Sequence, residues 1–133
     1  MTDEPDTKGP DAGWLLDDDT RAELMGRFPP RYAHAIARHV TAKPAPPGDA
    51  LPEPATCRII GRADDLAGVE ALVVEMNGTS DRPDGGVYHI TWSLEPGRKA
   101  RESNDVIRER GWDRTEPVPV PVRPARFDWR DPT

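Results

Sequence analysis

Short stretches rich in apolar, β-branched residues recur along the chain and predict strands. Residues 57–62, 69–76 and 87–93 have this composition and are bounded by turn-forming sequence. The second stretch is almost wholly apolar and closes at Asn77-Gly78, and a polar loop over residues 77–86 leads into the third. We therefore expect residues 69–76 and 87–93 to form an antiparallel hairpin with a long loop.

Two segments have the spacing and the end residues of helices. The first begins at Asp17-Asp18-Asp19, whose carboxylates suit a helix N-terminus, and ends before a pair of prolines. The second covers residues 103–110, with Ser103 as the expected N-cap and Gly111 just beyond its end. The elements then follow the order β-α-β, a linker, and β-β-β-α-β.

Two other segments each allow two interpretations. Alanines make a helix tolerable near residue 36, but we predict a strand over 36–42. This strand would turn one set of side chains toward a cleft, namely Ala37, His39, Thr41 and Lys43. It would turn the alternate set toward the core, namely Ile36, Val40 and Ala42. Residues 117–122 alternate proline with valine, which is typical of an edge strand or of polyproline II.

Length and composition favour one soluble domain. A chain of 133 residues can bury one core but is short for two domains. We expect a flexible acidic leader over residues 1–12 and one domain over 13–133, with a proline-rich connection at 43–55. Neither a signal peptide nor an apolar span of roughly 20 residues is evident. Together with a single cysteine, Cys57, this predicts a cytoplasmic protein that binds no membrane.

Charge limits the range of partners. The formal net charge of −6 disfavours a surface that tracks the phosphates of an extended duplex. We therefore expect a local contact with an RNA terminus or a small cyclic nucleotide, made by a monomer.

Two matching tripeptides, His39-Val40-Thr41 and His89-Ile90-Thr91, carry the chemistry. Residues two apart in a strand point the same way, so each tripeptide presents an imidazole beside a hydroxyl. Two such strands could surround one anion. One histidine would take a proton from water and the other would protonate a leaving ribose oxygen, while the threonines donate to the phosphate. This chemistry needs no metal and no cofactor.

These tripeptides, with Tyr88 before the second, resemble the signature motifs of the two-histidine phosphoesterase superfamily. The likeness is closest to its tRNA-ligase-like cyclic phosphodiesterase and RNA-repair branch. The resemblance implies an α+β fold of two pseudo-symmetric lobes, each an antiparallel sheet with flanking helices, around a central cleft. It also implies catalytic roles for His39 and His89, and phosphate binding by Thr41 and Thr91.

Other polar and aromatic residues are weaker candidates. Lys43, Arg98 and Lys99 are candidates for substrate binding, although each also suits a solvated turn. The three histidines and the cysteine match no compact zinc pattern, so we expect no metal site. Four aromatic residues could stack on a base, namely Trp14, Tyr88, Trp92 and Trp112. Most of them suit the core better, and alternation along the strand places Tyr88 and Trp92 inward.

Two alternatives to an enzyme remain. A binding module associated with RNA repair would keep the groove to sense RNA ends or nucleotides without catalysis. A structural protein with accidental motifs would hold the two histidines far apart or on different faces.

Overall fold

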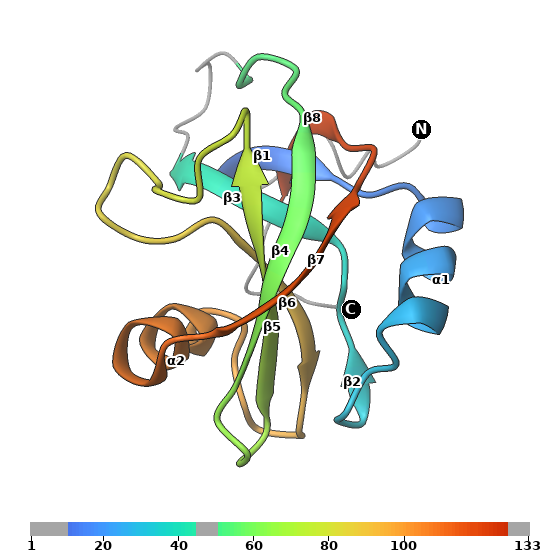
Figure 1. The fold of residues 1–133 in the computed structure, drawn as a ribbon, viewed down its shortest axis with the longest axis vertical. Helices are drawn as coiled ribbons and strands as arrows, with labels where there is room; N and C mark the ends of the chain where they lie inside the picture. Colours follow the sequence, from blue (N-terminus) through green and yellow to red (C-terminus); the bar gives the residue numbers. More distant parts are fainter. Residues whose placement is uncertain (1–10, 45–50, 128–133) are drawn as a thin grey trace, which may run out of the picture.

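Residues 11–44 and 51–127 are described by a computed structural model, in which apolar strands and two helices form an α+β fold (Figure 1). In chain order the elements are β1 (Asp11–Leu15), α1 (Asp18–Arg27), β2 (His34–Ala35), β3 (His39–Pro44), β4 (Cys57–Asp64), β5 (Val69–Met76), β6 (His89–Leu94), α2 (Glu102–Arg110), β7 (Asp113–Pro119) and β8 (Arg123–Phe127). The expected α+β class with antiparallel strands and flanking helices is confirmed.

One sheet contains all eight described strands. Its order is β7-β4-β5-β6-β3-β1-β8, with β2 paired to β6 outside that path. Every pairing between these strands is antiparallel, including the expected hairpin of β5 with β6. The pairing of β3 with β6 joins two segments that are about fifty residues apart in sequence, and it positions the candidate site.

Two apolar clusters lie on opposite faces of the central strands. On β5, Leu72 belongs to the cluster that also contains Leu24 of α1. Its neighbour Val73 belongs to the cluster that contains Val106 and Ile107 of α2. Figure 1 shows the two helices on opposite sides of these strands. Because both faces are covered, β5 is buried along nearly its whole length and is mostly apolar, with Glu70 buried among its apolar residues.

The N-terminus of α1 has the N-cap expected from the sequence, and the N-terminus of α2 does not. Asp17 is the N-cap of α1, as expected, and its Oδ1 accepts a hydrogen bond from the Thr20 amide at 2.7 Å. The expectation that Ser103 caps α2 is wrong. Arg101 occupies the N-cap without a side-chain hydrogen bond, and Ser103 lies inside the helix with its side chain fully buried.

The strand expected over residues 36–42 is interrupted. Ala37 has a φ of 49°, a left-handed conformation that separates β2 from β3. This break reverses the alternation before it, so Ala37 packs in the α1-side cluster and Ile36 in the α2-side cluster. The expected position of Ala37 on the cleft face is therefore wrong, whereas Ile36 and Val40 are buried in the core as predicted, although in different clusters.

The proline-valine segment enters the edge of the sheet through β7, whose one partner among the described strands is β4. Pro117 and Pro119 are exposed, while Val118 and Val120 are 5% and 4% exposed. An edge strand tolerates proline because one side of its backbone needs no partner. Of the two interpretations, the edge strand is confirmed up to Pro119. At the other edge, β8 was not expected from the sequence.

The boundaries of the domain differ from expectation at two places. Residues 1–10 of the expected leader lie outside the described residues, but Asp11 and Ala12 belong to β1. The first two residues of the expected connection at 43–55 belong to β3, and residues 45–50 lie outside the described part. Neither α1 nor α2 is long and apolar enough to cross a membrane.

Candidate active site

The two His-x-Thr tripeptides lie on the neighbouring strands β3 and β6, and their central residues face each other. Val40 pairs with Ile90, and both are fully buried against the α1-side cluster. Side chains alternate along a strand, so the histidines and threonines occupy the opposite face of the sheet. Because the strands run in opposite directions, each histidine lies toward the threonine of the other tripeptide.

The imidazoles of His39 and His89 lie within electrostatic reach of each other. Diagonal neighbours on paired strands are about 7–8 Å apart, which long side chains can span. His39 is partly exposed and His89 is 8% exposed. Burial lowers the pKa of His39 to about 3, with smaller contributions from His89 and Arg38, and burial lowers the pKa of His89 to about 4. Both rings are therefore neutral at neutral pH.

The backbone selects the tautomer of His89. Its Nδ1 lies 2.8 Å from the carbonyl oxygen of Val87, which can only accept a hydrogen bond. In the neutral ring the proton therefore sits on Nδ1, and Nε2 keeps its lone pair. This arrangement suits a general base, because the nitrogen that receives a proton is the one not held by the backbone.

Thr91 is engaged inside the protein. Its hydroxyl donates to the carbonyl oxygen of Ala100 at 3.2 Å and lies 2.9 Å from the hydroxyl of Ser103. Since a hydroxyl has one hydrogen, Ser103 must donate to Thr91 in this arrangement. The fully buried Ser103 thus ties the start of α2 to the second tripeptide, which explains why it does not cap the helix.

Thr41 lies in a more open position on β3. It is partly exposed and is the register partner of Gly13 on β1. A Cβ atom on Gly13 would lie 1.9 Å from the carbonyl oxygen of Val40, so only glycine lets the two strands come this close at the bulge after Ala12. The hydroxyl of Thr41 is therefore the more accessible of the two threonine donors.

Arg82 is a candidate residue that the sequence analysis missed. Its side chain is 10% exposed and influences His89 electrostatically. Its Nε donates to Asp84 and its Nη2 donates to Asn104, both at 2.9 Å. A Cβ on Gly86 would lie 2.6 Å from Nη2, so this glycine leaves room for the guanidinium. Within the described residues Nη1 forms no hydrogen bond, so its two N–H groups remain as donors on a side chain that acts electrostatically on His89.

The sequence around Arg82 predicts a turn, but it does not predict that the arginine lies near His89. Arg82-Pro83-Asp84-Gly85 is typical of a tight turn, with proline at its second position. The turn forms, because the Gly85 amide donates to the carbonyl oxygen of Arg82 at 2.9 Å and Gly85 has a φ of 92°. The direction of the arginine side chain depends on Asn104 of α2, which turn chemistry alone cannot reveal.

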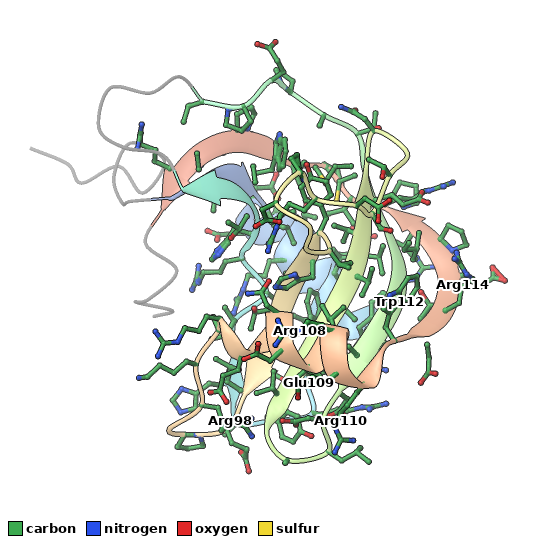
Figure 2. All side chains as sticks on the ribbon, turned by 90° about the vertical axis from the view of Figure 1, so that its left-hand side faces the viewer. Arg98, Arg108, Glu109, Arg110, Trp112 and Arg114 are labelled. Carbon is green, nitrogen blue, oxygen red and sulfur yellow. The ribbon has the colours of Figure 1, made fainter. Side chains whose placement is uncertain are left out.

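Of the three cationic candidates, Arg98 is engaged in ion pairs of its own. Arg98 forms ion pairs with Asp65 and Glu102, both at 2.9 Å, and follows the far end of β6. Two positions beyond Arg98, the carbonyl oxygen of Ala100 accepts a hydrogen bond from Thr91 of the second tripeptide. Figure 2 shows Arg98 in the lower part of the view, below Arg108 of α2. Lys99 next to it is exposed. Lys43 lies on β3, where it pairs with Ala12.

The aromatic candidates separate as expected. Trp14 and Tyr88 are 6% and 8% exposed, and Trp92 is fully buried with its indole N–H donating to the Phe28 carbonyl oxygen at 2.7 Å. Their assignment to the core is confirmed. Trp112 is only partly buried and lies beside α2. It is therefore the one aromatic ring among these four that lines a pocket described below.

Neither a cluster of metal-binding side chains nor a comparison with known proteins identifies the function of the site. Over residues 11–44 and 51–127, no group of three or more His, Cys, Asp or Glu side chains is arranged to hold a metal ion. The chain matches no family model, no curated protein and no solved structure. Its function must therefore be argued from the geometry around His39 and His89.

Proposed function

We propose that this chain is a metal-independent phosphodiesterase of the two-histidine superfamily, acting on 2′,3′-cyclic phosphates of RNA ends or small nucleotides. The observation that carries the proposal is the pairing of Val40 with Ile90, which sets both His-x-Thr tripeptides side by side on one face of the sheet. The proposal includes a cleft between two pseudo-symmetric lobes. These would be β1, β3 and β8 on one side and β4 to β7 on the other.

In the proposed reaction, water attacks phosphorus on the face opposite the leaving ribose oxygen. His89 takes the proton of the water at Nε2, the nitrogen that its bond to Val87 leaves with a lone pair. His39, once protonated, gives its proton to the ribose oxygen as the P–O bond breaks. The product is a phosphomonoester next to a free hydroxyl, and the two histidines have exchanged their protonation states.

Charge on the phosphate would be offset by neutral and cationic donors. Thr41 offers a partly exposed hydroxyl, and Arg82 offers the two N–H donors of Nη1. Thr91 would join them by turning its hydrogen from the carbonyl of Ala100 to the phosphate, while Ser103 still donates to its oxygen.

The low pKa values of the histidines predict an unusual pH dependence. The reaction needs one neutral and one protonated imidazole, so with pKa values of about 3 and about 4 this state peaks in acid in the free protein. We expect kcat/KM to fall about tenfold per pH unit above that range. A bound phosphate is negative and raises the pKa of a nearby histidine, so the optimum of kcat should lie at higher pH.

The direct test is hydrolysis of nucleoside 2′,3′-cyclic monophosphates, and of a short RNA ending in a cyclic phosphate, in EDTA. We expect turnover that His39→Ala and His89→Ala each reduce by about 10²-fold or more. His34→Ala is the matched control, because His34 is exposed on β2. Circular dichroism checks that each variant is folded. Absence of turnover in the folded wild type would refute the proposal.

A second substrate separates the acid from the base. A 4-nitrophenyl phosphodiester has a leaving group that needs no proton. If His39 is the acid, His39→Ala should lose far less activity on this substrate than on the cyclic phosphate. His89→Ala should lose activity on both. The opposite pattern would exchange the two roles and leave the reaction class intact.

One observation favours a binding module as the second candidate. The hydroxyl of Thr91 is committed to Ala100 and Ser103, which is compatible with a protein that holds a phosphate without turning it over. Such a protein would bind a 2′- or 3′-phosphorylated nucleotide in calorimetry and show no hydrolysis.

A further inference from the structure

A pocket of about 410 Å³ opens between the loop before β6 and the C-terminal half of α2. The loop and the start of the β6 segment contribute Arg82, Asp84, Gly85, Gly86 and Val87, and α2 with the residues after it contributes Asn104, Ile107, Arg108, Gly111 and Trp112. This volume lies within the usual range for small-molecule sites, about 300–1,000 Å³. In Figure 2, Arg108 and Trp112 lie on the side of the molecule where α2 crosses the sheet.

Two residues that line the pocket, Val87 and Arg82, interact with His89. Val87 lines the pocket, and its carbonyl oxygen holds Nδ1 of His89. The two residues are two positions apart on an extended segment, so their side chains face the same side. Arg82 lines the pocket and acts electrostatically on His89. A ligand at the histidines would therefore have this pocket as its next neighbour.

The second connection runs through α2. Asn104 lines the pocket and accepts the hydrogen bond from Arg82 at 2.9 Å. It directly follows Ser103, whose hydroxyl contacts Thr91 of the second tripeptide. The first turn of α2 therefore contacts the second tripeptide through Ser103 and lines the pocket through Asn104.

The lining suits a flat, mostly apolar group with a polar edge. Val87, Ile107 and Trp112 supply apolar surface, and all three belong to or pack on the α2-side cluster. Asp84 and Arg108 supply an acceptor and a donor at the rim, with side chains 55% and 66% exposed. This combination is typical of pockets that hold aromatic heterocycles.

The charges in the pocket argue against a second phosphate. The guanidinium of Arg82 is paired with Asp84, and Arg108 is paired with Asp105 at 2.6 Å. Arg108 therefore already has a carboxylate partner, and the remaining donors of Arg82, at Nη1, are assigned to the phosphate at the histidines, so the pocket gains little by taking up a second anion.

The indole ring of Trp112 is fixed in position by contacts with the backbone of β4 and with Arg114. A Cβ on Gly61 would lie 2.0 Å from the six-membered ring, so the indole packs directly on the backbone of β4. The guanidinium of Arg114 lies over the ring, 5.3 Å from its centroid. Figure 2 shows these two side chains beside each other.

We infer that this pocket binds the nucleobase of the nucleotide whose phosphate lies at His39 and His89. The inference rests on the proposed function, because it takes the position of the phosphate from it. It adds that the substrate is recognised as a nucleoside and not only as a cyclic phosphate. Trp112, Val87 and Ile107 form the apolar contact, and Asp84 and Arg108 meet the edge of the base.

The test compares two substrates in the same enzyme: guanosine 2′,3′-cyclic phosphate and glycerol 1,2-cyclic phosphate, which has no base. The readout is the kcat/KM for guanosine 2′,3′-cyclic phosphate divided by the kcat/KM for glycerol 1,2-cyclic phosphate. We expect this ratio to fall roughly tenfold in Trp112→Leu, which keeps apolar contact with Gly61 but removes the aromatic surface. We expect a fall of about threefold in Arg108→Ala. Arg110→Ala is the matched control, since Arg110 is exposed on α2 but outside this pocket.

The outcomes separate the inference from the proposed function. If both substrates are hydrolysed and neither Trp112→Leu nor Arg108→Ala changes the ratio beyond the control, the base pocket is refuted and the enzyme stands. If neither substrate is hydrolysed, calorimetry with guanosine 3′-monophosphate decides. Weaker binding in Arg108→Ala than in Arg110→Ala supports the pocket without the reaction, and equal binding in both refutes it. Arg108→Ala keeps the test decisive if Trp112→Leu fails to fold.

Discussion

The burial of His89 can be tested without any substrate, through the stability of the fold. We consider the replacement His89→Asn. The amide nitrogen of asparagine can occupy the place of Nδ1 and donate to the carbonyl oxygen of Val87, but the side chain does not titrate. The variant therefore keeps the local hydrogen bond and removes only the proton equilibrium.

The sign of the effect follows from the direction of the pKa shift. Burial lowers the pKa of His89 from 6.5 to about 4, so the unfolded chain takes up a proton first as the pH falls. The free energy of unfolding of the wild type should therefore decrease through this range. Between about pH 8 and about pH 5 the loss from this one group is about 2 kcal/mol.

The assay is urea unfolding of both proteins at a series of pH values, followed by circular dichroism. The difference in unfolding free energy between wild type and His89→Asn should change by about 2 kcal/mol from pH 8 to pH 5, in favour of the variant at acid pH. His34→Asn is the control, because an exposed imidazole keeps its water on folding. A difference that does not vary with pH would mean that His89 is hydrated, and would refute the buried site.

Three further results are expected. Glu70→Ala should lower the free energy of unfolding by about 3–5 kcal/mol in urea titration, because the carboxylate is fully buried and accepts the Ser93 hydroxyl at 2.7 Å. Thr91→Val should cost about 1–3 kcal/mol by leaving the Ser103 hydroxyl unpaired, and the added Ser103→Ala should recover part of this, in a double-mutant cycle. Burial raises the pKa of Cys57 to about 12, so the thiol should react with a disulfide reagent only after unfolding; reaction at native pH without denaturant would contradict this.

Much of the secondary structure could be predicted from local signals. Asp17 caps α1 because a carboxylate at that position meets a free backbone amide, whatever else the helix contacts. Gly111 ends α2 with a φ of 73° for an equally local reason. The mostly apolar sequence of β5 predicted a buried strand, and apolar clusters on both of its faces do bury it.

The local signals failed where distant contacts decided between alternatives of similar energy. Ser103 is a good N-cap residue, but its hydroxyl points inward to Thr91, which is distant in sequence. Ala37 gave no sign of a left-handed residue, yet this break lets Ile36 and Val40 pack on opposite faces of the sheet.

The sequence by itself determined that each histidine shares a face of its strand with the threonine two positions on, because alternation along a strand is a local property. Only the tertiary structure decided that β3 and β6 are neighbours, since strand pairing depends on the packing of the whole sheet. The same packing engages Arg98 with Asp65 and brings Arg82 within electrostatic reach of His89. The charges and the two tripeptides can be found in the sequence, but the contact between segments that are distant in sequence depends on how the core packs.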